Sequence, residues 1–150
     1  MRLLFISVSL VTLLAGCGGG ESAGEAVEDL VESFSESDYA AAYDSLHPDH
    51  QALVAEDRFV DCSLQAQEGA NPVVDEIDIT SENEVTRNVP ELGEVEVTVV
   101  GVDLTQGNEI FPRTWDVIKV DGDWRWLLAE ELLIDYREGR CPGEAASAST

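Results

Sequence analysis

The sequence predicts an α+β domain in which N-terminal helices pack on a curved antiparallel sheet. Apolar residues recur at helical spacing in the first half of the chain, most clearly over residues 25–34. The second half alternates apolar and polar residues, with valines at every other position over 94–99. Asp121-Gly122 then separates two apolar runs, and this dipeptide is typical of a hairpin turn. Helices followed by strands indicate an α+β arrangement rather than βαβ units.

The first 16 residues have the features of an export signal. Arg2 supplies a positive charge, and the apolar run that follows over 3–14 is too short to span a bilayer. The run ends in Leu-Ala-Gly-Cys17, which resembles the lipobox of bacterial lipoproteins. We therefore expect a signal peptide over 1–16 and a lipidated Cys17 with a flexible tether over 17–24. The alternative is an ordinary export signal beside a chance cysteine.

Lipidation would place the domain on the outer, extracytoplasmic face of the cell membrane. Acyl chains anchor a protein through the burial of methylene groups, each contributing roughly 0.8 kcal/mol. The expected partner of the lipid on Cys17 is therefore the membrane itself.

The chain is strongly acidic. It carries 31 Asp and Glu residues against 8 Lys and Arg residues, which gives a formal net charge of -23 at pH 7. Such a surface repels nucleic acid and anionic headgroups, so the sequence predicts no nucleic-acid partner. Two explanations of the acidity stay open: the solvated surface of a protein from a salt-adapted organism, and an acidic docking face.

Two cysteines remain once Cys17 is assigned to the lipid. An even pair in an exported domain is most simply a disulfide, so we expect Cys62 and Cys141 to be joined. Two free thiols or a metal pair are the alternatives, but no CxxC motif or His–Cys cluster accompanies these cysteines. The sequence predicts no metal site and no cofactor.

Three helices are expected before the sheet. Ser22 and Glu25 have the spacing of a capping box at the start of the first helix. Pro48 ends the second helix, because the residue before a proline disfavours the helical conformation. His47 is then expected to cap the C-terminus of its own helix. The expected spans are 22–34, 38–47 and 56–65.

The remaining elements are strands and one helical turn. Residues 82–88 are either a short edge strand or a turn. Trp115 on one strand and Trp126 on the next share the inward parity of the closing hairpin. A helical turn is expected over 130–136. The other expected strands are 73–79, 94–104, 109–120 and 124–128.

Two motifs suggest a family. The segment from Ser37 to Pro48, Ser-Asp-Tyr-Ala-Ala-Ala-Tyr-Asp-Ser-Leu-His-Pro, and the closing run from Trp115 to Trp126 resemble motifs of NTF2-like (SnoaL-like, cystatin-superfamily) proteins. The Cys-Pro-Gly ending is similar to that of small actinobacterial NTF2-like lipoproteins. The resemblance covers nearly all of the expected domain at 25–142. The residues after it, 143–150, are expected to form a disordered tail. The resemblance implies a cone, in which a strongly bent sheet wraps a long helix and leaves a cavity at the open end.

The resemblance also suggests where a site would lie. Enzymes of this family place a carboxylate, a histidine or a tyrosine in the cone, whereas other members bind small ligands, dimerise through the sheet or serve as accessory modules. The candidate pocket residues are Tyr39, Tyr43, Asp103, Trp115 and Trp126. The tyrosines and tryptophans have packing in the core as their alternative role.

Alternation along the strands sorts the remaining carboxylates. Asp103 shares parity with the valines of its strand and is expected to face inward, whereas Asp78 and Asp116 are expected to face outward.

The sequence supports a binding role better than a catalytic one, because it contains no coherent catalytic set. We expect a membrane-anchored lipoprotein that binds a small apolar ligand or an envelope protein, with a homodimer through the sheet as one arrangement. One alternative is a small enzyme similar to ketosteroid isomerases or dehydratases, which would use Tyr39 or Tyr43 with Asp103. The other alternative is an accessory module of a cell-envelope complex.

Overall fold

The computed structural model describes residues 21–68 and 73–143. The expected leader, Cys17, the break at 69–72 and the tail beyond 143 lie outside the described residues. The elements in chain order are α1 (Ala23–Ser35), α2 (Tyr39–Asp44), α3 (Pro48–Gln51), α4 (Glu56–Gln67), β1 (Glu76–Val89), β2 (Gly93–Gln106), β3 (Glu109–Val120), β4 (Asp123–Trp126) and α5 (Glu130–Arg137).

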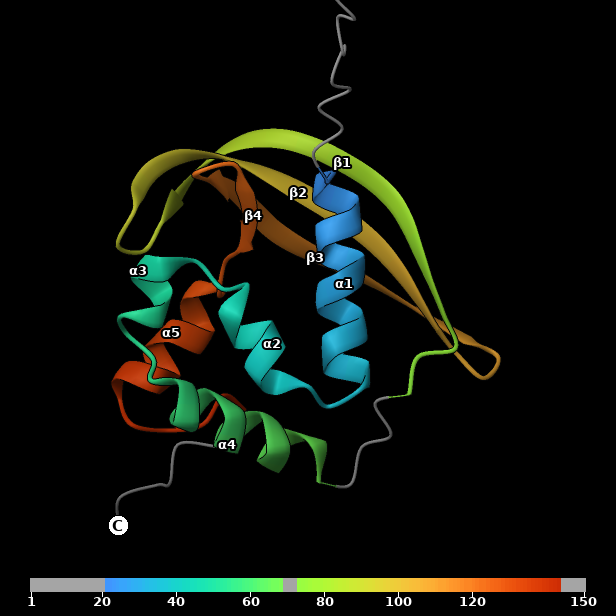
Figure 1. The fold of residues 1–150 in the computed structure, drawn as a ribbon, viewed down its shortest axis with the longest axis horizontal. Coiled ribbons are helices and arrows are strands. Elements are labelled where there is room, and N and C mark those ends of the chain that lie inside the picture. The colour runs from blue at the N-terminus through green and yellow to red at the C-terminus, as the bar shows by residue number, and fades with distance from the viewer. Residues whose placement is uncertain (1–20, 69–72, 144–150) are drawn as a thin grey trace, which may run out of the picture.

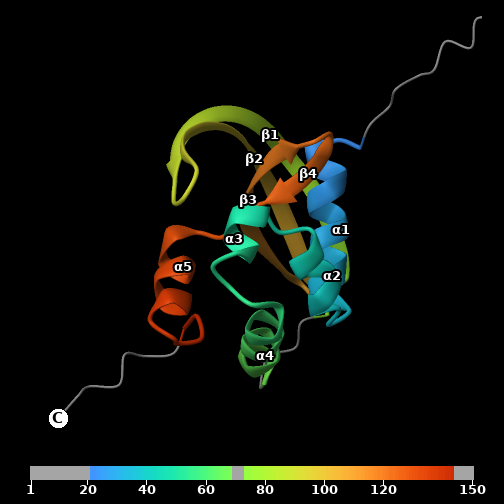
Figure 2. The ribbon, with the colours of Figure 1, turned by 60° about the vertical axis from the view of Figure 1, so that its left-hand side comes forward.

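The strands form one antiparallel sheet in the order β1-β2-β3-β4, and the sheet arches over the N-terminal helices (Figure 1). The α+β prediction is therefore confirmed. A second view shows the end of the β1–β2 hairpin bending back toward α3 and α5 (Figure 2). Side-chain contacts hold this end in place: the Arg137 side chain of α5 forms an ion pair with Glu91 in the hairpin turn.

The long strand β1 resolves the open question about residues 82–88, which belong to an edge strand rather than a turn. Its register against β2 shifts between Ile79 and Ser81, as in a β-bulge. Ser81 lies opposite Gly101, where a Cβ atom would come within 2.5 Å of the Ser81 hydroxyl oxygen. The glycine thus allows the two strands to approach closely at the bulge.

The first helix begins at Ala23, as the capping-box spacing predicts, so it overlaps the end of the expected tether over 17–24. Ser22 and Glu25 form the predicted capping box, so Ala23 and Gly24 are already helical. A carboxylate oxygen of Glu82 on β1 also accepts a hydrogen bond from the Gly24 amide at 3.1 Å. A negative charge at a helix N-terminus stabilises the helix, so β1 helps to fix where α1 starts.

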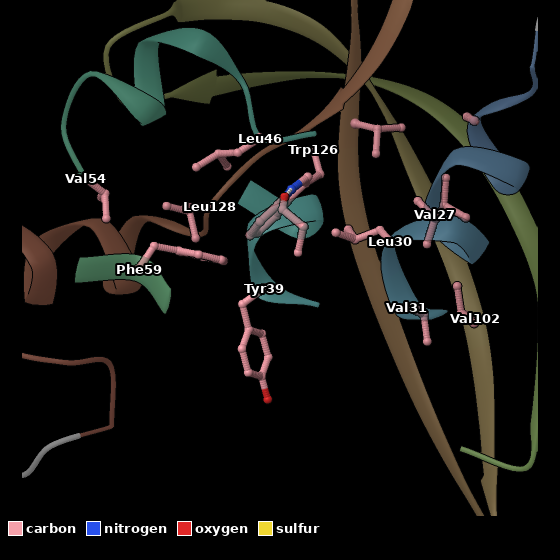
Figure 3. Close-up of a cluster of buried hydrophobic side chains, with 14 of the residues drawn as sticks. Val27, Leu30, Val31, Tyr39, Leu46, Val54, Phe59, Val102, Trp126 and Leu128 are labelled. Carbon is pink, nitrogen blue, oxygen red and sulfur yellow. Dashed lines mark hydrogen bonds between the residues drawn. The ribbon is translucent and has the colours of Figure 1, made fainter. Parts of the chain in front are cut away.

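Trp126 lies at the centre of the main core (Figure 3). Its indole ring lies 5.9 Å from the ring of Phe34 and 6.0 Å from that of Phe59, and its Nε1 donates to the carbonyl oxygen of Ala42 at 2.8 Å. Its backbone bonds to the link between α2 and α3, through Ser45 and His47. One residue thus connects α1, α2 and α4 to the sheet.

Pro48 starts a helix rather than ending one, so the expected role of His47 is wrong. Helix α2 ends at Asp44, and Pro48 occupies the first turn of α3. The ring of proline fixes a helical φ, which suits this position. His47 is the N-cap of α3, and its Nδ1 accepts a hydrogen bond from the Asp49 amide at 3.1 Å.

The predicted disulfide between Cys62 and Cys141 is present. Both cysteines are buried, and their Cα atoms lie 5.2 Å apart. Arg58 of α4 adds a hydrogen bond to the carbonyl oxygen of Gly139 at 2.6 Å. These contacts join α4 to the segment after α5, whose Leu133 is fully buried.

Loss of the disulfide should destabilise the domain. The bond joins residues separated by 79 positions, so the pair Cys62→Ser and Cys141→Ser should lower the free energy of unfolding. We expect a loss of about 2–5 kcal/mol, because the open chain gains conformational entropy when unfolded. Urea unfolding followed by tryptophan fluorescence measures it, with the neighbouring Ser63→Ala as a control. An unchanged midpoint in the double variant would contradict this expectation.

Candidate functional site

A pocket of about 450 Å³ lies where the chain leaves the sheet after β4. Three segments wall it: residues 87–90 at the end of the β1–β2 hairpin, residues 114–116 of β3, and residues 126–132, which lead into α5. The walls mix apolar side chains with charged ones. Such a lining could contact both an apolar and a polar part of a ligand, so the pocket is a candidate binding site.

The pocket exists because β4 is much shorter than β3. The two strands pair only between Val117↔Trp126 and Val120↔Asp123. One further bond follows, from the Leu127 amide to the carbonyl oxygen of Asp116 at 2.9 Å. The next amide, that of Leu128, donates instead to Nδ1 of His50 at 3.1 Å. The chain therefore separates from β3 and leaves a gap beside residues 114–116.

His50 joins two walls of this pocket. The side chain is fully buried, and its Nδ1 accepts from the Leu128 amide. Its Nε2 lies 3.2 Å from the carbonyl oxygen of Pro90, at the tip of the hairpin. These partners assign the proton of a neutral imidazole to Nε2, so one ring nitrogen accepts while the other donates. His50 thus ties α3 to the hairpin tip and to the segment before α5.

The surroundings of His50 favour its neutral form. Burial lowers the pKa of His50, and this effect outweighs the hydrogen bond to the Pro90 carbonyl, which raises it. His47 and Arg137 lower the same pKa further, while Asp49 raises it. Burial also lowers the pKa of His47, with Asp49 opposing and Arg125 adding to that shift.

An ion pair crosses the pocket wall between β1 and β3. The Arg87 guanidinium lies 3.2 Å from the Asp116 carboxylate, whose side chain is 24% exposed. Burial raises the pKa of Asp116, and Arg87 partly offsets this effect. Asp116 was expected to face solvent, and this is wrong, because its carboxylate is partly buried and paired with Arg87. Asp116 does lie on the sheet face opposite Trp115, but a second apolar cluster around Val97 and Leu127 forms on that face.

The same register corrects the expectation for Asp103. Val100 and Val102 of β2 face the main core, whereas Val97 belongs to the second cluster. Asp103 shares the parity of Val97 and lies between Asp78 and Pro112 on the neighbouring strands. It therefore does not face the main core and does not line the pocket.

The structure brings together two of the five candidate pocket residues, Trp115 and Trp126. The Tyr39 hydroxyl donates instead to Oε1 of Gln67 at 2.5 Å. The Tyr43 hydroxyl lies 2.8 Å from the carbonyl oxygen of Val54 and 3.1 Å from that of Gln51. Neither tyrosine lines the pocket, so the Tyr–Asp103 set does not assemble there.

Neither Arg87 nor His50 was singled out from the sequence, and Asp116 was expected to face outward. The only local signal for His50 was its place in the first turn after Pro48. Arg87 and Asp116 are 29 positions apart and meet only because β1 and β3 flank β2.

Two features are absent from the described residues. No group of three or more His, Cys, Asp or Glu side chains there could hold a metal ion. None of the helices in the same part of the chain has the length and apolar character needed to cross a bilayer.

The described part of the chain is thus an α+β domain with a pocket beside a short closing strand and a disulfide between α4 and the segment after α5. The chain matches the family described as Domain of unknown function (DUF4878) over residues 15–127 and belongs to that family. The match ends at Leu127, so α5 and Cys141 lie beyond it. No curated protein matches the chain.

Acidification should weaken the fold through His50. Its folded pKa lies below the ordinary value of 6.5, so the unfolded chain binds protons first as the pH falls. The free energy of unfolding should be highest above pH 6.5 and decline as the pH falls below that value, by at most about 1.4 kcal/mol per pH unit for this one group. Urea unfolding at a series of pH values measures the decline.

Two variants separate the histidines. His50→Gln keeps a donor and an acceptor without titrating, so it should reduce the pH dependence and leave the contribution of His47. His47→Asn keeps a good N-cap for α3 and should leave the contribution of His50 in place. A pH dependence that is unchanged in His50→Gln would show that another group controls it.

Proposed function

We propose that the protein is a lipid-anchored, extracytoplasmic NTF2-like module that binds a small amphipathic ligand. The pocket beside β3 is the observation that carries this proposal. Its lining includes Trp115, Trp126 and both members of the Arg87–Asp116 ion pair, so an apolar body and one polar group would both find partners.

Binding is proposed rather than catalysis because two titratable groups at or beside the pocket, Asp116 and His50, already bond within the fold. Both ring nitrogens of His50 are engaged by backbone groups. Asp116 is paired with Arg87. A general base would need a free position facing its substrate, and these two groups are occupied.

The membrane anchor is supported by the lipobox-like Leu-Ala-Gly-Cys17 and by the disulfide. Disulfides persist mainly in oxidising compartments outside the cytosol, which agrees with export. The NTF2-like assignment is supported by the arch of the sheet over α1 and by the closing β3–β4 hairpin (Figure 1).

Removal of the lipidation site should release the protein. In cells that express Cys17→Ser, we expect the protein to leave the membrane fraction, because no acyl chains remain to hold it. Membrane fractionation and the mass of the N-terminal peptide measure this. The disulfide variant Cys62→Ser with Cys141→Ser is the control and should stay in the membrane fraction. A wild-type N-terminal peptide with an unmodified Cys17 would rule out the anchor.

Filling the pocket should block binding. Ala129 is exposed at the start of α5 and lines the pocket, so the bulky side chain of Ala129→Trp should occupy the ligand volume. With anilinonaphthalene sulfonate as an amphipathic probe, we expect affinity to fall at least about tenfold, or roughly 1.4 kcal/mol. Probe fluorescence measures the affinity.

The control for this test is Ala66→Trp, which adds the same side chain at an exposed position on α4. It should bind the probe as the wild type does. Equal affinity in Ala129→Trp and the wild type would place the binding site elsewhere.

A further inference from the structure

The chain between Cys17 and the folded domain is short, and its end is fixed. The carbonyl oxygen of Glu21 accepts a hydrogen bond from Nε1 of Trp124 at 2.8 Å, and α1 begins two residues later at Ala23. Cys17 precedes Glu21 by four positions. At about 3.3–3.6 Å per residue, a fully extended chain spans at most about 14 Å between them.

Glu21 lies at one particular end of the molecule. The start of α1 and β4 lie at this end, whereas α4 lies at the other (Figures 1 and 2). Helix α1 has 13 residues and runs from the first end toward the second. Its length of about 20 Å exceeds the reach of the tether. A lipid on Cys17 could therefore hold only the first end close to a bilayer.

We propose that the domain faces the phospholipid headgroup layer with this anchor end, formed by Glu21, Lys119, Asp121, Asp123 and Trp124. The inference rests on the proposed function, since it requires a lipid on Cys17. It adds an interaction surface and a fixed orientation, in which α4 and the disulfide at its side point away from the membrane.

The charge of the anchor end determines which lipid headgroups it can contact. Burial raises the pKa of Glu21, and the carboxylates of Asp29, Glu25 and Asp123 raise it further. Lys119 is the one lysine of the chain, and its ammonium lies 5.3 Å from the centre of the Trp124 ring. Acidic residues are not attracted to anionic headgroups, so the contact between the anchor end and the bilayer depends on the short tether and not on charge attraction. Zwitterionic headgroups carry no net charge and do not repel the anchor end. Anionic headgroups should repel it within a Debye length of about 10 Å at 0.1 M salt.

The single lysine makes this orientation measurable. The full chain is expressed in a bacterium, purified from membranes and added to preformed phosphatidylcholine vesicles. Lys119 is then acylated with a small amine-reactive ester and with the same ester on a long polyethylene glycol chain. We expect the ratio of the bulky to the small rate to fall several-fold, because the bilayer blocks the bulky reagent. Mass spectrometry of the peptides separates Lys119 from the N-terminus.

Two matched variants isolate the cause. A 20-residue Gly-Ser insertion between Gly20 and Glu21 leaves the domain unchanged but lets it move away from the bilayer, so the shielding of Lys119 should disappear. Moving the lysine to α4, with Lys119→Arg and Gln65→Lys, should give a ratio that does not depend on the tether. Equal shielding of Lys119 with the native and the lengthened tether would overturn the orientation.

Failure of the proposed function gives a different result. In that case the N-terminal peptide carries no acyl group. The orientation is then measured on the same chain coupled through its Cys17 thiol to a maleimide phospholipid. That measurement depends only on the tether length and on the contact between Glu21 and Trp124, so the same two outcomes support or overturn it.

Discussion

The burial of Trp126 is the interaction on which the rest of the structure depends. Its ring packs against Phe34 of α1 and Phe59 of α4, and its indole N–H reaches Ala42 of α2. Truncation of a buried tryptophan typically costs about 3–5 kcal/mol, a large part of the stability of a small domain. The two residues that follow have different partners. The Leu127 side chain joins the second apolar cluster, and the Leu128 amide donates to His50. The backbone path of residues 126–128 therefore determines both how the main core packs and where the pocket lies.

Local signals in the sequence were enough to predict most of the fold. The capping box at Ser22 and the turn at Asp121-Gly122 depend on neighbouring residues, and the structure contains both, with Gly122 at a φ of 100°. The disulfide could be predicted because the expectation of export, with Cys17 set aside for a lipid, left two cysteines with one possible pairing. Pro48 was a local signal that was read in the wrong direction, since a proline can end one helix or start the next.

The site could not be predicted in the same way, because it depends on how the sheet bends. Alternation correctly grouped Asp103 with Val97 on one face, but it could not show that this face carries a second cluster near Asp116. The role of His50 requires Pro90 and Leu128 to approach it from segments 40 and 78 positions away. Such contacts exist only once the hairpin end has curled back toward α3.

The anchor end, the main core and the pocket all include residues of the β3–β4 hairpin that closes the sheet. Trp124 fixes the first described residue of the chain, Trp126 fills the core, and the residues after it wall the pocket. The proposed binding role therefore requires that a ligand contact the residues after β4 and the end of the β1–β2 hairpin that faces them.

Amide chemical-shift mapping of the isotopically labelled protein, titrated with a lipid extract of the host's cell envelope, tests that requirement most directly. The account predicts that the shifts gather at the amides of residues 87–89, 114–116 and 126–132, which wall the pocket. Shifts confined to α4 or spread along the outer edge of β1 would contradict it.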